Sequence, residues 1–129
     1  TMALTHETAA TLLERYATAW ADHDGDAFVA LHTEDAESVE DPFKPPLVGS
    51  NALRQRLLDA AEAEEQVEFT FERHWVVAPT ILAPWHASYV DRDSRARVRM
   101  AGFATFEIAD DGRIRRARFW SNRAETPAG

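Results

Sequence analysis

Two side chains far apart in the sequence are candidates for acid–base chemistry: the carboxyl group of Asp41 and the phenol of Tyr16. Asp41 lies between Glu40 and Pro42, and an apolar neighbour such as Phe43 makes a carboxylate a stronger general base by partly desolvating it. A buried phenol needs a hydrogen-bond partner, so Tyr16 is a candidate donor. The spacing alone favours a strand that ends in a turn at Asp41, and a core tyrosine bonded to the backbone.

Other catalytic and metal-binding patterns are absent from the sequence. With no cysteine, a disulfide framework, a thiolate nucleophile and a cysteine–zinc site are excluded. The histidines are isolated, the serines lie in no nucleophile elbow, and the glycines form no phosphate-binding loop. We therefore expect neither a metal nor an organic cofactor. Acid–base chemistry by a carboxylate, or simple ligand binding, remains.

The elements that must position these groups begin with helices. Apolar residues at three- and four-residue steps predict a helix over Thr5 to Ala21, with Tyr16 on its apolar stripe. A short second helix carries Phe28, and a third, capped by Ser50, carries Leu57. A short strand over Ala36 to Asp41 and a proline-rich loop separate the last two helices.

After Gln66 the apolar period changes from 3.6 to 2, which predicts strands. These cover Val67–Val77, Ile81–Val90, Arg97–Ile108 and Ile114–Ser121. The order α-α-β-α-β-β-β-β is typical of an α+β fold, with three helices on one face of a curved, mostly antiparallel sheet. We expect a single domain over residues 1–129.

Composition restricts the class of protein further. The chain has 129 residues, 45 % of them hydrophobic, which fits one globular domain. No apolar run reaches the roughly 20 residues of a membrane helix, and no signal-like segment opens the chain, so we expect a cytoplasmic protein without membrane partners. The net charge of −8 argues against a nucleic-acid partner, although arginines gather in the last third.

The segment Asp35 to Gly49 resembles the corresponding segment of bacterial ketosteroid isomerases, members of the nuclear-transport-factor-2-like superfamily of cone-shaped α+β folds. Two more blocks, Leu12–Tyr16 and Gly112–Ser121, align in the same order and are shared with polyketide cyclases. The resemblance implies that Asp41 moves a proton next to a ketone while Tyr16 hydrogen-bonds the dienolate oxygen. It also implies a small apolar or polycyclic ketone as ligand and a homodimer through the sheet.

The family's second oxyanion donor is missing, because Ala104 stands at the position of a protonated aspartic acid. Losing one such donor typically lowers turnover by about 10²–10³. Arg118 is a possible replacement, but we expect it to point outward, and His86 to face the outer surface of the sheet. A binding protein without catalysis and a polyketide cyclase remain open alternatives.

Strand alternation and the resemblance together predict the lining of an apolar pocket. We expect the ligand to contact six side chains: Phe43, Leu57, Trp85, Met100, Ala104 and Trp120. Phe103 alternates onto the opposite face of the sheet, where it suits a dimer contact.

Overall fold

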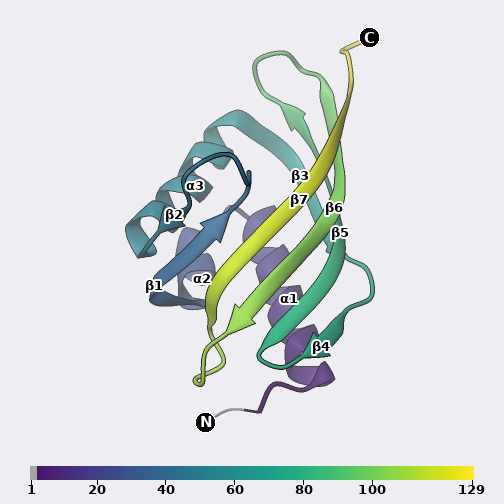
Figure 1. The fold of residues 1–129 in the computed structure, drawn as a ribbon. Coiled ribbons are helices and arrows are strands. Elements are labelled where there is room, and N and C mark those ends of the chain that lie inside the picture. Colours follow the sequence, from purple (N-terminus) through teal and green to yellow (C-terminus); the bar gives the residue numbers. More distant parts are fainter. Residues whose placement is uncertain (1–2) are drawn as a thin grey trace.

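The computed structural model describes residues 3–129, which form three helices and a seven-stranded sheet (Figure 1). The helices are α1 (His6–Ala21), α2 (Gly25–Ala30) and α3 (Ser50–Ala63). The strands are β1 (His32–Val39), β2 (Leu47–Val48), β3 (Glu64–Phe71), β4 (Trp75–Val77), β5 (Thr80–Asp91), β6 (Arg97–Ile108) and β7 (Ile114–Thr126). This arrangement confirms the predicted α+β class.

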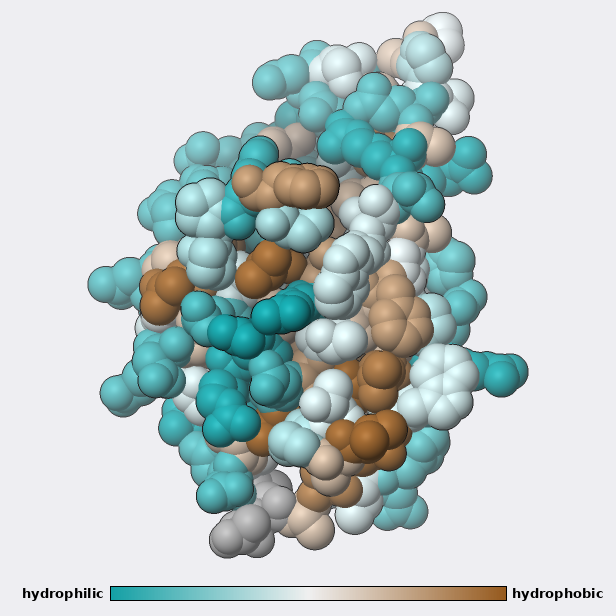
Figure 2. Space-filling view, viewed as in Figure 1, coloured by the Kyte–Doolittle hydropathy of each residue, from teal (hydrophilic) through white to brown (hydrophobic). Residues whose placement is uncertain are grey.

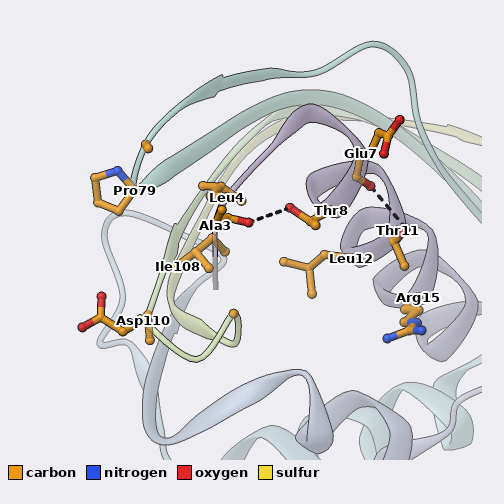
Figure 3. A pocket seen from close by; sticks show the side chains of 13 residues that line it. Ala3, Leu4, Glu7, Thr8, Thr11, Leu12, Arg15, Pro79, Ile108 and Asp110 are labelled. Carbon is orange, nitrogen blue, oxygen red and sulfur yellow. Dashed lines mark hydrogen bonds between the residues drawn. The ribbon is translucent and has the colours of Figure 1, made fainter. Parts of the chain in front are cut away.

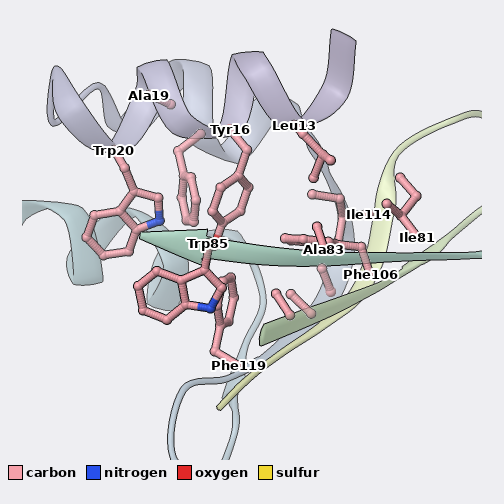
Figure 4. Close-up of a cluster of buried hydrophobic side chains, with 14 of the residues drawn as sticks. Leu13, Tyr16, Ala19, Trp20, Ile81, Ala83, Trp85, Phe106, Ile114 and Phe119 are labelled. Atoms are coloured by element: carbon pink, nitrogen blue, oxygen red, sulfur yellow. The ribbon is translucent and has the colours of Figure 1, made fainter. Parts of the chain in front are cut away.

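Helix α1 begins where local side chains satisfy its first free amides. The hydroxyl of Thr5 accepts the Thr8 N–H at 3.1 Å, and the Thr8 hydroxyl accepts the Thr5 N–H at 2.9 Å. The buried stripe then recurs at three- and four-residue steps through Ala9, Leu13, Tyr16 and Trp20. The stripe turns the Tyr16 ring toward the sheet, as Figure 4 shows.

The strand order in the sheet is β2-β1-β7-β6-β5-β3, with β4 paired to β5. Only the β1–β7 pair among these is parallel, so the curled sheet is mixed. The helices lie behind the sheet in Figure 1, against its concave face, and the other face is uncovered. Within the described residues, no helix has the length and apolar character needed to cross a membrane.

Several element boundaries differ from the sequence prediction. The predicted strand Val67–Val77 is two strands, because residues 72–74 leave the ladder between β3 and β4. Strand β7 continues to Thr126, where it still pairs with Arg97 of β6. Ser50 is the first residue of α3 and not its cap, since Gly49, with φ at 90°, precedes the helix as its N-cap residue.

A β-bulge at Arg115 reverses the expected alternation along β7. Ile108 pairs with Ile114 but Glu107 pairs with Arg116, so one extra residue stands in β7. As a result Phe119 is buried against the core, whereas Trp120 is on the outer face with 43 % of its surface exposed. The sequence predicts that Trp120 points inward, but the bulge turns its side chain to the outer face.

The core between α1 and the sheet is built largely from aromatic rings. Tyr16 is 1 % exposed, and its ring centroid lies 5.2–6.0 Å from those of Phe28, Phe69, Phe106 and Phe119. Offset and edge-to-face contacts of this kind add to the stabilisation from burial. The first helix is thereby held at one place on the concave face, and Tyr16 with it.

Candidate functional site

A small cavity lies between α1, the end of α3 and the concave face of the sheet. Its volume is about 90 Å³. Its apolar wall contains the rings of Tyr16, Trp20, Phe69, Trp85 and Phe119, and its polar side is formed by Glu40, Arg56, Glu64, Tyr89 and Ser121. A cavity of about 150 Å³ accommodates benzene, so the enclosed space suits a ligand no larger than one small ring. A polycyclic ligand requires side chains to move.

A larger hollow of about 500 Å³ lies at the start of α1, beside the turn between β6 and β7 (Figure 3). Its hydroxyl groups bond to their own helix segment: Thr11 donates to the Glu7 carbonyl at 3.2 Å, and Thr8 donates to the Thr5 carbonyl at 3.2 Å. Because these polar groups are used locally, we place the candidate site in the smaller cavity, where titratable groups converge.

Tyr16 supplies the cavity with a neutral hydrogen-bond donor. Burial raises the pKa of the Tyr16 phenol far above its ordinary value, a polar contact with the Trp20 indole partly opposes this, and the charge of Glu40 adds to it. The phenol therefore keeps its proton at any physiological pH and can stabilise a developing negative charge on a ligand oxygen.

Glu40 and Arg56 form a two-point ion pair at the polar side of the cavity. The Arg56 Nε donates to Glu40 Oε2 at 2.8 Å, and Nη2 donates to Oε1 at 3.0 Å. Burial lowers the pKa of Arg56, but the hydrogen bonds and charge of Glu40 more than reverse this and raise it. The guanidinium also lies 5.0 Å from the centre of the Trp20 ring, which fixes its position.

Glu64 is the free carboxyl group of the site. It follows the last residue of α3 and opens β3, and no ion pair to it is found within residues 3–129. Burial raises the pKa of Glu64, Arg56 lowers it, and Glu40 raises it again, with a net upward shift. A carboxyl group with a raised pKa is a stronger base than an ordinary carboxylate, which suits it to take and return a proton.

The structure does not bring Asp41 to this cavity. Its Oδ1 accepts the Phe43 N–H at 2.9 Å and its carbonyl accepts the Lys44 N–H at 3.1 Å, the geometry of a turn. Side-chain alternation along β1 explains the placement, because Ala36 and Ser38 are buried and the next inward position is Glu40. The arrangement agrees with the alternative reading of Asp41 as a strand end with a turn.

The other predicted ligand contacts divide into three groups. Trp85 and Met100 line the cavity. Leu57 and Ala104 are 1 % and 0 % exposed within the core and do not line it. Phe43 is 95 % exposed at the tip of its loop, and, like Trp120, lies away from the cavity.

Sequence reasoning missed Glu40, Arg56 and Glu64 as a group. Counting alternate positions from Ala36 would have identified Glu40 as the inward carboxylate. No local signal joins Arg56 on a helix to Glu64 at a helix–strand junction. Across residues 3–129, no cluster of three side chains suited to hold a metal is present.

The fold and the cavity together define an NTF2-like α+β protein with a cavity between helix and sheet. Residues 13–117 match the family model of the SnoaL-like domain, and the chain belongs to this family within the NTF2-like superfamily. The resemblance to that superfamily noted in the sequence is confirmed. No curated protein sequence matches the chain.

Three solved structures illustrate the fold. SalBIII, an epoxide hydrolase/cyclase-like enzyme in pyran ring formation in salinomycin, is 18 % identical with a TM-score of 0.79 over 90 % of this chain and 92 % of its own. An LEH-like epoxide hydrolase from Mycobacterium tuberculosis is 19 % identical, TM-score 0.75, over 91 % and 84 %. A ketosteroid isomerase-like protein from Erwinia carotovora atroseptica is 16 % identical, TM-score 0.70, over 90 % and 95 %. These likenesses show a shared fold.

Proposed function

We propose that the protein is a cofactor-independent enzyme that moves a proton next to the carbonyl group of a small apolar ketone. One observation carries this proposal: a buried neutral phenol, Tyr16, and a free carboxyl group of raised pKa, Glu64, line the same largely apolar cavity. Such pairs of groups with different proton affinities are the means by which one site donates hydrogen bonds and transfers protons at neutral pH.

The proposed reaction needs one base and one hydrogen-bond donor. The Glu64 carboxylate takes a proton from the carbon between the carbonyl and the C=C bond of a β,γ-unsaturated ketone. The electron pair of that C–H bond forms a new C=C bond, and the carbonyl π pair moves onto the oxygen to give a dienolate. Tyr16 donates a hydrogen bond to this oxygen. Glu64 then returns the proton to the γ-carbon of the dienolate, the C=C bond moves into conjugation with the carbonyl, and the substrate is isomerised without net loss of atoms. Glu40 accepts two hydrogen bonds from Arg56 and serves to position that guanidinium.

Asp41 remains the base implied by the family resemblance. For Asp41 to act at the cavity, its turn with Phe43 and Lys44 has to open. The size of the cavity favours a single-ring ketone over a steroid, because Trp20, Phe69 and Trp85 fill the space that a polycyclic substrate needs.

The test uses 3-cyclohexenone, whose conversion to the conjugated isomer is followed by absorbance. We expect Tyr16→Phe to lower the catalysed rate by about 10²–10³ and Glu64→Gln to lower it by about 10²–10⁴. Glu62→Gln, at an exposed carboxyl group on α3 that does not line the cavity, is the matched control with little change. Loss of the rate in Asp41→Asn but not in Glu64→Gln assigns the base to Asp41, and a wild-type rate equal to that of buffer refutes catalysis.

Epoxide opening is a second candidate, favoured by the two carboxyl groups beside one guanidinium. Here protonated Glu64 gives its proton to the epoxide oxygen, while the Glu40 carboxylate accepts a proton from the attacking water. Two of the similar structures are described as epoxide hydrolase-like. Hydration of cyclopentene oxide, with Glu40→Gln compared to Glu64→Gln, separates this reaction from isomerisation.

A non-catalytic binding protein is the simplest alternative. It is favoured by the absence of a second carboxylic acid donor at position 104, where Ala104 stands. It is also favoured because the Glu40 carboxylate is already bound to Arg56. Two tryptophans line the cavity, so fluorescence titration with cyclohexanone measures binding directly. Saturable binding without turnover of either substrate supports this alternative.

The uncovered face of the sheet supports a homodimer as the proposed assembly. Phe103 and Trp120 are opposite each other across β6 and β7, and they are 37 % and 43 % exposed. On the next strand, β5, Pro84 pairs with Phe103 and extends this apolar row across three strands. Figure 2, viewed onto this face, shows apolar residues among polar ones, the mixture typical of an interface between subunits.

A further inference from the structure

Trp85 carries a buried hydrogen-bond donor that the reaction proposed above does not use. Its side chain is 4 % exposed and lines the cavity, and its Nε1–H has no acceptor among the described residues. One ring nitrogen of His23 and one of His32 are also buried without a hydrogen-bond partner among the described residues, but neither histidine lines the cavity. Buried donors in native proteins nearly always have a hydrogen-bond acceptor, so we expect the indole N–H of Trp85 to bind one.

The position of the Trp85 ring is set by its neighbours. It stacks on Phe69, with centroids 5.3 Å apart and planes at 5°, and its edge meets Phe119 at 5.8 Å. On the adjacent strand β6 the residues opposite and nearby are small: Gly102 pairs with Trp85, and Ala104 follows. The small side chain of Ala104 lies on the same face of the sheet as Trp85, and Figure 4 shows the indole beside Phe119.

We propose that the Trp85 indole N–H binds the oxygen of the ligand, as a second donor beside Tyr16. This inference rests on the proposed function for the ligand class, an uncharged apolar compound with one acceptor oxygen. Ala104 has no polar group to offer, and the indole supplies a donor from the neighbouring strand. A compound without an acceptor leaves both donors unpaired and is rejected, because unpaired buried donors cost more than missing apolar contacts.

The test is a binding experiment on the wild-type protein. The four tryptophans give four indole N–H signals in a ¹⁵N-correlated NMR spectrum. The signal of Trp85 is assigned by its loss in Trp85→Phe, or by its proximity to Phe69 and Phe119 if that variant fails to fold. Cyclopentanone is added to saturation, and methylenecyclopentane, which has the same shape with a carbon in place of the oxygen, serves as the control ligand.

We expect cyclopentanone, and not methylenecyclopentane, to move the Trp85 indole proton downfield. We also expect Trp85→Phe to weaken cyclopentanone binding about tenfold while changing methylenecyclopentane binding far less. Equal responses to the two ligands, a shift confined to Trp20, or no binding of cyclopentanone each overturn the proposal. Because binding is measured without turnover, a catalytically silent protein can still pass this test, and an active one can fail it.

Discussion

Arg56 and Glu40 are joined by two hydrogen bonds, of 2.8 Å and 3.0 Å, between the third helix and the residue that follows β1. The pair closes the polar side of the cavity and leaves Glu64 as its unpaired carboxyl group. Burial is the main cause of the raised pKa of Glu64, while the charge of Arg56 lowers it and that of Glu40 raises it, so the pair adjusts the proton affinity of the proposed base.

Glu40→Gln should shift the pH dependence of the reaction to lower pH. A base works only when it is ionised, so the wild-type rate falls as the pH drops through the raised pKa of Glu64. The charge of Glu40 is one cause of the raised pKa of Glu64, so removing it lowers that pKa. The charge of Arg56 then remains and favours the ionised form of Glu64. We expect the acid limb of the pH–rate profile to move down in Glu40→Gln. An unchanged acid limb would show that Glu64 is not the titrating base.

The buried histidine of the core should make the protein less stable in mild acid. Burial lowers the pKa of His32 from 6.5 to about 4, and the hydrogen bond between its Nδ1 and the Phe28 carbonyl, 2.7 Å long, partly opposes this. A histidine with a depressed pKa binds its proton more tightly in the unfolded chain. Its contribution is therefore complete above pH 6.5 and is lost as the pH falls toward 4, a loss of about 3 kcal/mol.

Urea unfolding of the wild type and of His32→Leu, at several values between pH 7 and pH 4, measures this loss. The difference in unfolding free energy between the two proteins isolates His32 from the carboxyl groups that titrate in the same range. His74→Leu, at a half-buried histidine outside the hydrophobic core, is the comparison variant. A constant difference between wild type and His32→Leu contradicts the prediction.

A methyl group at position 102 should disrupt the pairing of β6 with β7. A Cβ atom on Gly102 would lie 1.8 Å from the Trp120 carbonyl oxygen, and backbone cannot rotate away as a side chain can. We expect Gly102→Ala to lower the free energy of unfolding by about 3 kcal/mol. Ala101→Ser, one residue earlier and exposed, is the matched control and should stay within about 0.5 kcal/mol of the wild type.

The proposed homodimer predicts a concentration-dependent assembly that a charge on the outer face abolishes. Trp120→Glu places a carboxylate beside Phe103 in the middle of this face, where a partner would leave it desolvated. Sedimentation velocity should give a dimer for the wild type and a monomer for Trp120→Glu. Phe43→Glu, on an exposed loop at 95 % exposure, is the comparison variant. A monomeric wild type at all concentrations rules out this assembly.

Local patterns in the sequence determined much of this structure. Both ends of the first helix lie within one residue of the predicted bounds. The capping threonine marks its start, and the apolar stripe through Tyr16 marks its course. The change of period after Gln66 correctly predicts the long strands. Such signals are short-range, since the helical and strand periods repeat every few residues and each segment carries its own apolar face. The segment Asp35–Gly49 also indicated the superfamily that the family match confirms.

The tertiary structure alone decided which side chains meet. One bulge at Arg115, in a strand that pairs with both β6 and β1, turns Trp120 outward and Phe119 inward. The inward carboxylate after β1 is Glu40, because alternation runs from buried Ala36 and not from Pro42. Arg56 and Glu64 reach the cavity only through the packing of α3. Register and packing depend on contacts between segments distant in the chain, which no local pattern encodes.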